Sequence, residues 1–247
     1  MLISDTAGMG KSTVLTQLSK QIKQKFPKKW VVRIDINDHT DALNTLQQKH
    51  INKEKAVEFV SEKLLKFQRG VGLALFKECC EEKQKVKIVI MVDGFDEISP
   101  DLQGRVIDML QVLKQTSLEQ LWVTSRTHLR EKLEENLQQL SYTLQPFSEE
   151  EQVEFLKNFW TGNLNTEVTN QDRLQIFAKL LIRKLSQSIS DKDKEFTGIP
   201  LQTRMLAEAF EEKFISFYES QTTQPELPHN LDLLGLYRQF IDSKYDT

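Results

Sequence analysis

The chain has few of the residues that define a disulfide framework, a zinc site or a membrane span. Only two of its 247 residues are cysteines, and they are adjacent, at Cys79 and Cys80. Adjacent cysteines suit neither a disulfide framework nor a zinc site, and they fit the reducing cytoplasm. No apolar run approaches the length of a membrane helix, and the amino terminus lacks the pattern of a secretory signal. We therefore expect a cytoplasmic protein without a membrane span.

An excess of positive charge is also missing. The formal net charge is −3, from 33 basic and 36 acidic residues. Because a general nucleic-acid-binding domain usually carries a basic surface, the composition gives no indication of nucleic-acid binding. The four histidines are scattered, without the spacing of a metal site. A chain of this length with 39% hydrophobic residues has room for one large globular domain or two smaller ones.

The most informative stretch runs from Met1 to Gln24. A short apolar strand at residues 1–4 precedes a loop with two glycines, and an amphipathic helix is predicted over Lys11–Lys25. Strand, glycine-containing loop, lysine, hydroxyl side chains and helix form the layout of a phosphate-binding P-loop. The residues predicted to bind a nucleotide here are Thr6, Ala7, Gly8, Met9, Gly10, Lys11, Ser12 and Thr13.

Each residue type in this loop has a chemical reason. Gly8 and Gly10 allow successive backbone N–H groups to turn towards phosphate oxygens, and the helix directs its positive dipole end at the same anion. We expect Lys11 to bridge the β- and γ-phosphates, Ser12 to hold Mg²⁺, and Thr13 to reach the α-phosphate side. One position departs from the full pattern, since an acid, Asp5, stands where the first glycine belongs. It supplies no phosphate donor, and we expect it to narrow the turn or to cap the loop.

A second stretch, residues 86–97, is an apolar run that ends abruptly in the acids Asp93, Asp96 and Glu97. A central parallel strand delivers carboxylates to its carboxyl-terminal edge in this way, and ligands bind at that edge in open α/β sheets. The alternative is a buried strand followed by an acidic turn that caps the next helix. Because a P-loop lies upstream, the sequence favours Asp93 as a direct or indirect ligand of Mg²⁺.

Alternating strands and helices predict the fold class. Further strands are predicted at Trp30–Ile36, which we expect to be buried, at Leu121–Arg126 and at Leu140–Leu144, and helices are predicted over 40–82 and 101–115. The helical segment 40–82 is expected to break at Gly70 and Gly72. Together these elements predict an α/β fold with a doubly wound, parallel, five-stranded P-loop NTPase sheet. At the end of its strand, Arg126 either senses the γ-phosphate or is an ordinary surface arginine.

From residue 146 onwards only helices are predicted. Ser148 and the glutamates after it start one helix, a second spans Leu174–Leu185, and a third, after Gly198-Ile199-Pro200, carries the apolar positions Met205–Phe217. We therefore expect a P-loop core at 1–145 and an all-helical subdomain at 146–247. An apolar strand already begins at Met1, and a helical run reaches Tyr245 without a cap signal. These ends suggest a truncated product or a piece of a longer chain, with the helical subdomain cut at its carboxyl terminus.

Taken together, the motifs resemble the NACHT domain of the STAND class of P-loop NTPases, nucleotide switches of innate-immune and apoptotic signalling. The resemblance covers nearly the whole chain and rests on four features: the P-loop of residues 8–13, the acidic box of residues 93–97, Thr124-Ser125-Arg126 as first sensor, and Gly198-Ile199-Pro200. The acidic box is the most discriminating, because simple kinases and small GTPases rarely place three acids in that arrangement.

The resemblance implies a function as well as a fold. Strands would be inserted between the P-loop strand and the acidic-box strand, and Pro200 would lie near the adenine. Asp96 or Glu97 would position the attacking water, which together with Lys11 and Arg126 makes four predicted catalytic residues. The implied activity is a switch that binds ATP or ADP with Mg²⁺, hydrolyses ATP slowly, and assembles with its own kind or with other signalling proteins.

Two other functions stay open at the sequence level. A scaffold module that binds nucleotide without hydrolysis is one, since Asp5 departs from the P-loop pattern. A P-loop kinase for a small molecule is the other, with Arg126 and Arg130 as candidate lid residues. The loop does not identify the base, and ATP is preferred over GTP from the resemblance and from the lack of a guanine-reading Asn-Lys-x-Asp sequence.

Overall fold

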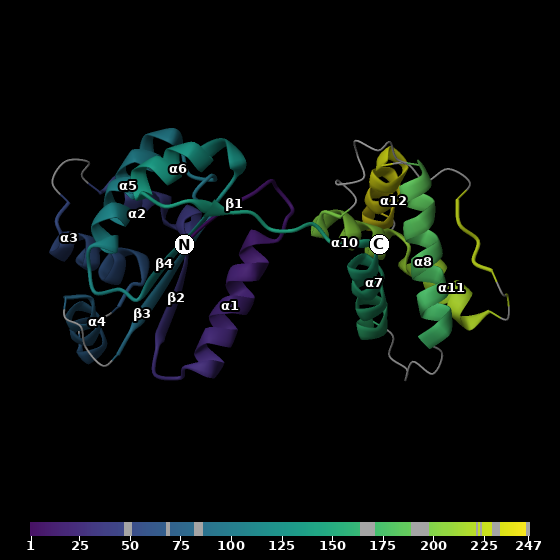
Figure 1. The fold of residues 1–247 in the computed structure, drawn as a ribbon, viewed down its shortest axis with the longest axis horizontal. Coiled ribbons are helices and arrows are strands. Elements are labelled where there is room, and N and C mark those ends of the chain that lie inside the picture. Colours follow the sequence, from purple (N-terminus) through teal and green to yellow (C-terminus); the bar gives the residue numbers. More distant parts are fainter. Residues whose placement is uncertain are drawn as a thin grey trace. The chain divides into compact units, whose positions relative to one another are not determined.

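The computed structural model describes residues 1–46, 51–67, 70–81, 86–163, 171–188, 198–220, 222, 224–228 and 233–245. The chain divides into two compact units, Met1–Leu144 and Gln145–Thr247, which we call unit 1 and unit 2. Unit 1 combines a sheet with helices, and the described part of unit 2 contains helices without a strand (Figure 1).

Unit 1 is built on five parallel strands in the order β2-β3-β4-β1-β5. Their bounds are β1 (Leu2–Ser4), β2 (Trp30–Asp35), β3 (Ile88–Asp93), β4 (Gln120–Ser125) and β5 (Ser141–Tyr142). One strand, β4, lies between the P-loop strand β1 and the acidic-box strand β3, where the resemblance implied more than one. The predicted five-stranded parallel sheet is confirmed.

Helices cover both faces of this sheet, as in a doubly wound fold. The helical segments of unit 1 are α1 (Lys11–Lys25), a 3₁₀ turn (Ile36–His39), α2 (Thr40–Asn44), α3 (Lys53–Glu58), a π-helix (Phe59–Leu64), α4 (Val71–Glu81), α5 (Pro100–Lys114), a 3₁₀ turn (Thr127–Leu129) and α6 (Arg130–Leu137). Helix α1 packs on one face, and α2 to α6 pack on the other (Figure 1).

The continuous apolar run of β3 follows from this coverage of the sheet by helices on both faces. Side chains of a strand alternate between faces, so a strand covered on both sides must be apolar throughout. Ile88, Ile90 and Val92 enter the core under α2–α6, while Val89 and Met91 enter the smaller core under α1. All six residues of β3 are buried, and Asp93 is the last of them. Folding thereby fixes one carboxylate at the carboxyl-terminal edge of the sheet.

Three sequence expectations for unit 1 are wrong in detail. Strand β2 was expected to be buried, but it is an edge strand with only Ile34 buried, because β3 is its single neighbour. Ile36 falls in the following 3₁₀ turn rather than in the strand. Gly72 does not interrupt the helical segment but lies within α4, since one glycine in a helix costs only about 1 kcal/mol.

Unit 2 packs five described helices around aromatic side chains. Their bounds are α7 (Glu149–Asn163), α8 (Gln171–Ser188), α10 (Pro200–Ala209), α11 (Glu211–Glu219) and α12 (Leu233–Tyr245). Trp160 stacks on Phe214 with ring centroids 4.6 Å apart, and its indole N–H donates to the Ala207 carbonyl at 2.9 Å. The helix predicted across 205–217 is in fact two helices, which meet at Phe210.

The start of α7 shows the predicted capping arrangement. The Ser148 hydroxyl accepts a hydrogen bond from the Glu151 N–H, and the Glu151 carboxylate accepts one from the Ser148 N–H. In the described part of the chain, no helix has the length and hydropathy needed to cross a bilayer.

Candidate functional site

The P-loop has a backbone that only glycine adopts easily at two positions. Gly8 and Gly10 have φ angles of 82° and 85°, in the left-handed region. Gly10 is also the N-cap residue of α1, and its carbonyl accepts the first helical hydrogen bond, from Val14. Between them, Met9 turns its side chain into the protein. The loop therefore opens directly onto the amino end of a 15-residue helix, which is the geometry that favours a bound anion.

Lys11 is bound to the loop itself. Its ammonium donates to the carbonyl oxygens of Asp5 and Thr6, at 2.9 and 2.8 Å. Burial lowers the pKa of this ammonium below its ordinary value, although the nearby carboxylates of Asp96 and Asp5 oppose that effect. The ammonium thus lies between the phosphate-binding loop and the acidic edge of the sheet.

Asp5, the departure from the P-loop pattern, has a structural role. One carboxylate oxygen accepts from the Thr6 N–H, and the other accepts from the Leu144 N–H, each at 2.7 Å. Its own N–H donates to the Ser125 carbonyl at 3.1 Å. The side chain therefore fastens the start of the loop to the chain beyond β5 and caps the loop as the sequence suggested, while the backbone N–H ties it to the end of β4.

Asp93 receives side-chain hydrogen bonds from the two strands that flank β3. Thr124 of β4 donates to one carboxylate oxygen, and Arg33 of β2 donates to the other at 2.7 Å. The Ser12 hydroxyl of the P-loop also lies near enough to this carboxylate to affect its pKa. Burial alone would raise the pKa of Asp93, but the interactions with Thr124, Arg33 and Ser12 outweigh it and lower the pKa below its usual value. Ser12 and Asp93, 81 positions apart in the sequence, thus meet at one point.

Arg33 is the functional candidate that the sequence did not reveal. It lies in the edge strand β2 and also contacts the Thr16 hydroxyl of α1, so it links α1 to the carboxylate of Asp93. The available signal was a lone charge within an apolar run, Val31-Val32-Arg33-Ile34. That signal gains meaning only with the pairing of β2 and β3, which places Arg33 beside Met91, two residues before Asp93.

The remaining acids and Arg126 differ in their surroundings. Asp96 pairs with Arg126 at 2.8 Å, and the side chain of Asp96 is only 7% exposed. Glu97 is exposed, and its carboxylate accepts a hydrogen bond from the Asn37 amide at 3.4 Å. Arg130, the other arginine considered for a kinase lid, pairs with Glu134 one turn along α6 at 3.0 Å.

The other predicted site residues are distributed as follows. Thr6, Ala7 and Thr13 are exposed around the P-loop. Pro200 belongs to unit 2, where it opens α10, and its place beside a bound base stays a prediction. The glycine before it is required by packing, because a Cβ on Gly198 would lie 2.7 Å from the Phe147 carbonyl oxygen.

The residues predicted to hold Mg²⁺ suit that ion. A hydroxyl from Ser12 and a carboxylate from Asp93 are the oxygen ligands that Mg²⁺ prefers, and in nucleotide sites the phosphates and water supply the rest. Within the described ranges, no three or more His, Cys, Asp or Glu side chains gather into a metal site of their own. The donor set fits a cation bound together with a phosphate ligand.

Comparison with solved structures gives distant likenesses. A chain from the structure of Drosophila ORC bound to DNA aligns over 100% of this chain, at 14% identity with a TM-score of 0.48. The crystal structure of Saccharomyces cerevisiae RIF2 aligns over 90% of this chain, also at 14% identity, with a TM-score of 0.40. This chain covers 61% of the length of the first and 77% of the second. No curated protein sequence gives a significant match.

Comparison with protein families gives a direct result. The profile of the NACHT domain matches residues 1–162, which include the P-loop, the acidic box and all five strands of the sheet. The match spans well over half of the 247 residues. The chain therefore belongs to the NACHT domain family of P-loop NTPases.

Proposed function

We propose that this chain is a nucleotide switch that binds ATP or ADP with Mg²⁺ and hydrolyses ATP slowly. The observation that supports this most is the closeness of the Ser12 hydroxyl of the P-loop to the Asp93 carboxylate of the acidic box, near enough to help lower the pKa of Asp93. It brings the two motifs together at the amino end of α1, where a metal-bound triphosphate would bind.

The groups that bind the phosphates are already close to their working positions. The backbone N–H groups of residues 8–12 lie at the amino end of α1, and the Lys11 ammonium rests on two carbonyl oxygens. On binding, this ammonium would exchange those oxygens for the β- and γ-phosphates, and Thr13 would contact the α-phosphate side. Ser12 and Asp93 would hold Mg²⁺, which neutralises phosphate charge when it is bound.

Arg33 has a defined part in this scheme. Without a cation, Asp93 is a nearly buried carboxylate, with 4% of its side chain exposed. An unpaired charge at such a place is costly, and the Arg33 guanidinium neutralises it. We infer that Arg33 stabilises the nucleotide-free protein and yields part of its contact with Asp93 when Mg²⁺ binds.

Of the two acids proposed to position water, the surroundings favour Glu97. Asp96 is nearly buried and is already neutralised by Arg126. It is therefore suited to orient Arg126 towards the γ-phosphate. Glu97 is exposed, and among the residues that the structure describes its carboxylate accepts one weak hydrogen bond, from Asn37, which leaves it available to orient water.

The switch would use both units of the chain. We propose that Pro200 of unit 2 contacts the adenine, so that ATP and ADP stabilise different arrangements of the units. A differential contact of a few kcal/mol is enough to reverse such an equilibrium. Assembly with like domains or with other signalling proteins would be the output.

A cytoplasmic setting fits the free, buried Cys79 and Cys80. Burial raises the pKa of the Cys80 thiol to about 12 and keeps it unreactive.

Phosphate release from purified protein tests the proposal. We expect slow, Mg²⁺-dependent phosphate release from the wild type. In Glu97→Gln the rate of release should fall on the order of 10-fold or more, as when a catalytic base is lost. ATP binding by that variant should be unchanged. Asp96→Asn should weaken the response to the γ-phosphate, so that ATP and ADP bind with more similar affinities. If a protein that carries both Asp96→Asn and Glu97→Gln releases phosphate at the wild-type rate, the roles proposed for both acids are wrong.

A second function, a scaffold that binds nucleotide without hydrolysis, is favoured by one observation. Both ion pairs at the site, Arg33–Asp93 and Arg126–Asp96, neutralise acids that hydrolysis would use. The scaffold predicts tight ATP binding with no phosphate release above background in the same assay. A kinase gains no support, because Arg130 is held by Glu134 on α6.

A further inference from the structure

A cluster of basic residues lies at the amino-terminal ends of β2 and β3, on the side of the sheet opposite to the P-loop. Helix α1 starts at the P-loop and carries the chain about 22 Å along its 15 residues, to Lys25. A short connection then enters β2 at Trp30, whose N–H donates to the Lys87 carbonyl just before β3, at 2.9 Å. Because β2 and β3 are parallel, this edge is the one opposite to Asp93.

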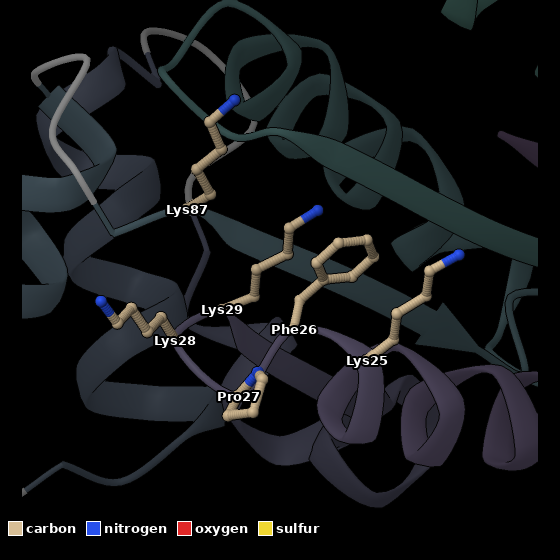
Figure 2. A pocket seen from close by; sticks show the side chains of 6 residues that line it. All are labelled: Lys25, Phe26, Pro27, Lys28, Lys29 and Lys87. Carbon is tan, nitrogen blue, oxygen red and sulfur yellow. The ribbon is translucent and has the colours of Figure 1, made fainter.

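At this edge six residues surround a hollow of about 420 Å³, a volume typical of small-molecule sites. We call it the lysine pocket, and its lining residues are Lys25, Phe26, Pro27, Lys28, Lys29 and Lys87. Figure 2 shows the ring of Phe26 between the side chains of Lys25 and Lys29.

The lysine pocket has a surplus of positive charge. The last turns of α1 and the connection to β2 hold five lysines and no acid. Glu119 lies 2.9 Å from the Lys29 ammonium and 3.9 Å from that of Lys87. In the parts of the chain that the structure describes, no carboxylate pairs with Lys25 or Lys28. One carboxylate for four ammonium groups leaves a local field that attracts anions, in a chain whose net charge is negative.

The ordinary role of such lysines explains only part of this cluster. A lysine in the last turn of a helix stabilises the negative end of the helix dipole, and Lys25 does so. Lys28, Lys29 and Lys87 lie outside the helix. Phe26 also calls for an explanation, because 42% of it is exposed. The ammonium groups of Lys29 and Lys25 lie 4.1 and 5.6 Å from its ring centroid, so cation–π contacts group the charges around an exposed apolar face.

We propose that the lysine pocket binds a compact anion that carries several phosphate groups on a ring-like scaffold. Separate ammonium groups act as point charges for separate phosphates, and the face of Phe26 packs against the apolar face of the scaffold. The limited volume selects a small ligand. Such a ligand is either free in solution or the headgroup of a lipid. Either would bind at the far end of α1 from the P-loop and would be independent of the nucleotide site.

The test uses the full chain in a Lys11→Ala background without Mg²⁺, so that the P-loop does not contribute. Inositol hexakisphosphate is titrated by calorimetry against this protein, against the same protein with Lys25→Gln and Lys87→Gln, and against a version with Lys53→Gln and Lys179→Gln. Both lysines of the last pair are exposed, neither lines the pocket, and their substitution changes the net charge equally. We expect the pocket substitutions to weaken binding at least tenfold and the control pair to change it less than twofold. Phe26→Ala should weaken binding without altering the charge.

Vesicles with and without a phosphorylated inositol lipid distinguish the two sources. Binding of the soluble ligand alone assigns the pocket to a free polyphosphate, and preferential binding of the vesicles assigns it to a lipid headgroup. Equal affinity of the pocket and control variants would overturn the proposal. Tighter binding of a single-stranded oligonucleotide by the same lysines would also overturn it, because it would replace a small ligand with a nucleic acid.

Discussion

The two units bury different kinds of side chain. Unit 1 buries polar and charged groups at one edge of its sheet, among them Ser4, Asp5, Asp93 and Thr124. The interior of unit 2 is mainly apolar, and aromatic rings, among them the stacked Trp160 and Phe214, pack there with aliphatic side chains. A buried polar group needs a partner, so the interior of unit 1 specifies a site as well as a fold. An aromatic core specifies packing, so substitutions in the two interiors should separate function from stability.

The largest loss of stability is expected from a substitution in the aromatic core of unit 2. Phe214→Ala removes the ring that stacks on Trp160 at 4.6 Å and meets Phe177 at 5.6 Å. We expect a loss of about 3–5 kcal/mol in the free energy of unfolding, measured by chemical denaturation. Leu201→Ala, at a position 47% exposed in the same unit, is the matched control and should change stability by less than about 1 kcal/mol. Equal effects would show that this core does not stabilise unit 2.

The next effect concerns binding at the site of unit 1. Lys11→Ala removes an ammonium that hydrogen-bonds two loop carbonyls and is attracted by nearby carboxylates. We expect ATP to bind more weakly by about 2–4 kcal/mol, roughly 30- to 900-fold, with little change in melting temperature. Titration calorimetry and thermal unfolding measure the two quantities. A large loss of stability with unchanged affinity would reverse the distinction between the units.

A smaller loss of stability is expected at Arg33, which belongs to the candidate site and also stabilises the fold. Arg33→Met leaves the buried Asp93 carboxylate without its ion pair. Because a third of the Arg33 side chain is exposed, the expected loss is reduced to about 1–2 kcal/mol of unfolding free energy. In an Asp93→Asn background the same substitution should cost less, and a double-mutant cycle measures that difference. Full additivity of the two substitutions would contradict the coupling.

The smallest effect should appear as a dependence on pH. Hydrogen bonds from the Ser141 hydroxyl and N–H, together with Arg130, lower the pKa of Glu134 from 4.5 to about 2. Since the folded-state pKa is depressed, the carboxylate stabilises the protein above pH 4.5, and this contribution is lost as the pH falls towards 2. Glu134→Gln should therefore lower the melting temperature at pH 7 and narrow its difference from the wild type at pH 3. A difference that is the same at both pH values would exclude this linkage.

Local patterns predicted the elements that local chemistry determines. The spacing of Val14, Leu15, Leu18 and Ile22 predicted α1 with its observed bounds, and the apolar run before Asp93 predicted a central strand. Helix α6 was missed because its pattern is short, with only Leu133 and Leu137 buried over eight residues. Its position also depends on the tertiary contact between Glu134 and Ser141.

The contacts that organise the site were beyond local patterns. Asp5 is bonded to the Leu144 amide, and Arg33 reaches Asp93 through the pairing of β2 with β3. Neither partner is near in sequence, so no spacing rule identifies it. The sequence predicts which groups would contact a nucleotide, and the structure shows which groups hold those side chains in place.

Equilibrium binding of ATP and ADP, with and without Mg²⁺, to the wild type and to Asp93→Asn tests the central claim most directly. The account predicts that Mg²⁺ strengthens ATP binding to the wild type more than ADP binding. It also predicts that Asp93→Asn loses this enhancement while it keeps the Mg²⁺-free affinity. No binding of either nucleotide at millimolar concentration, or the same Mg²⁺ enhancement in both proteins, would contradict it.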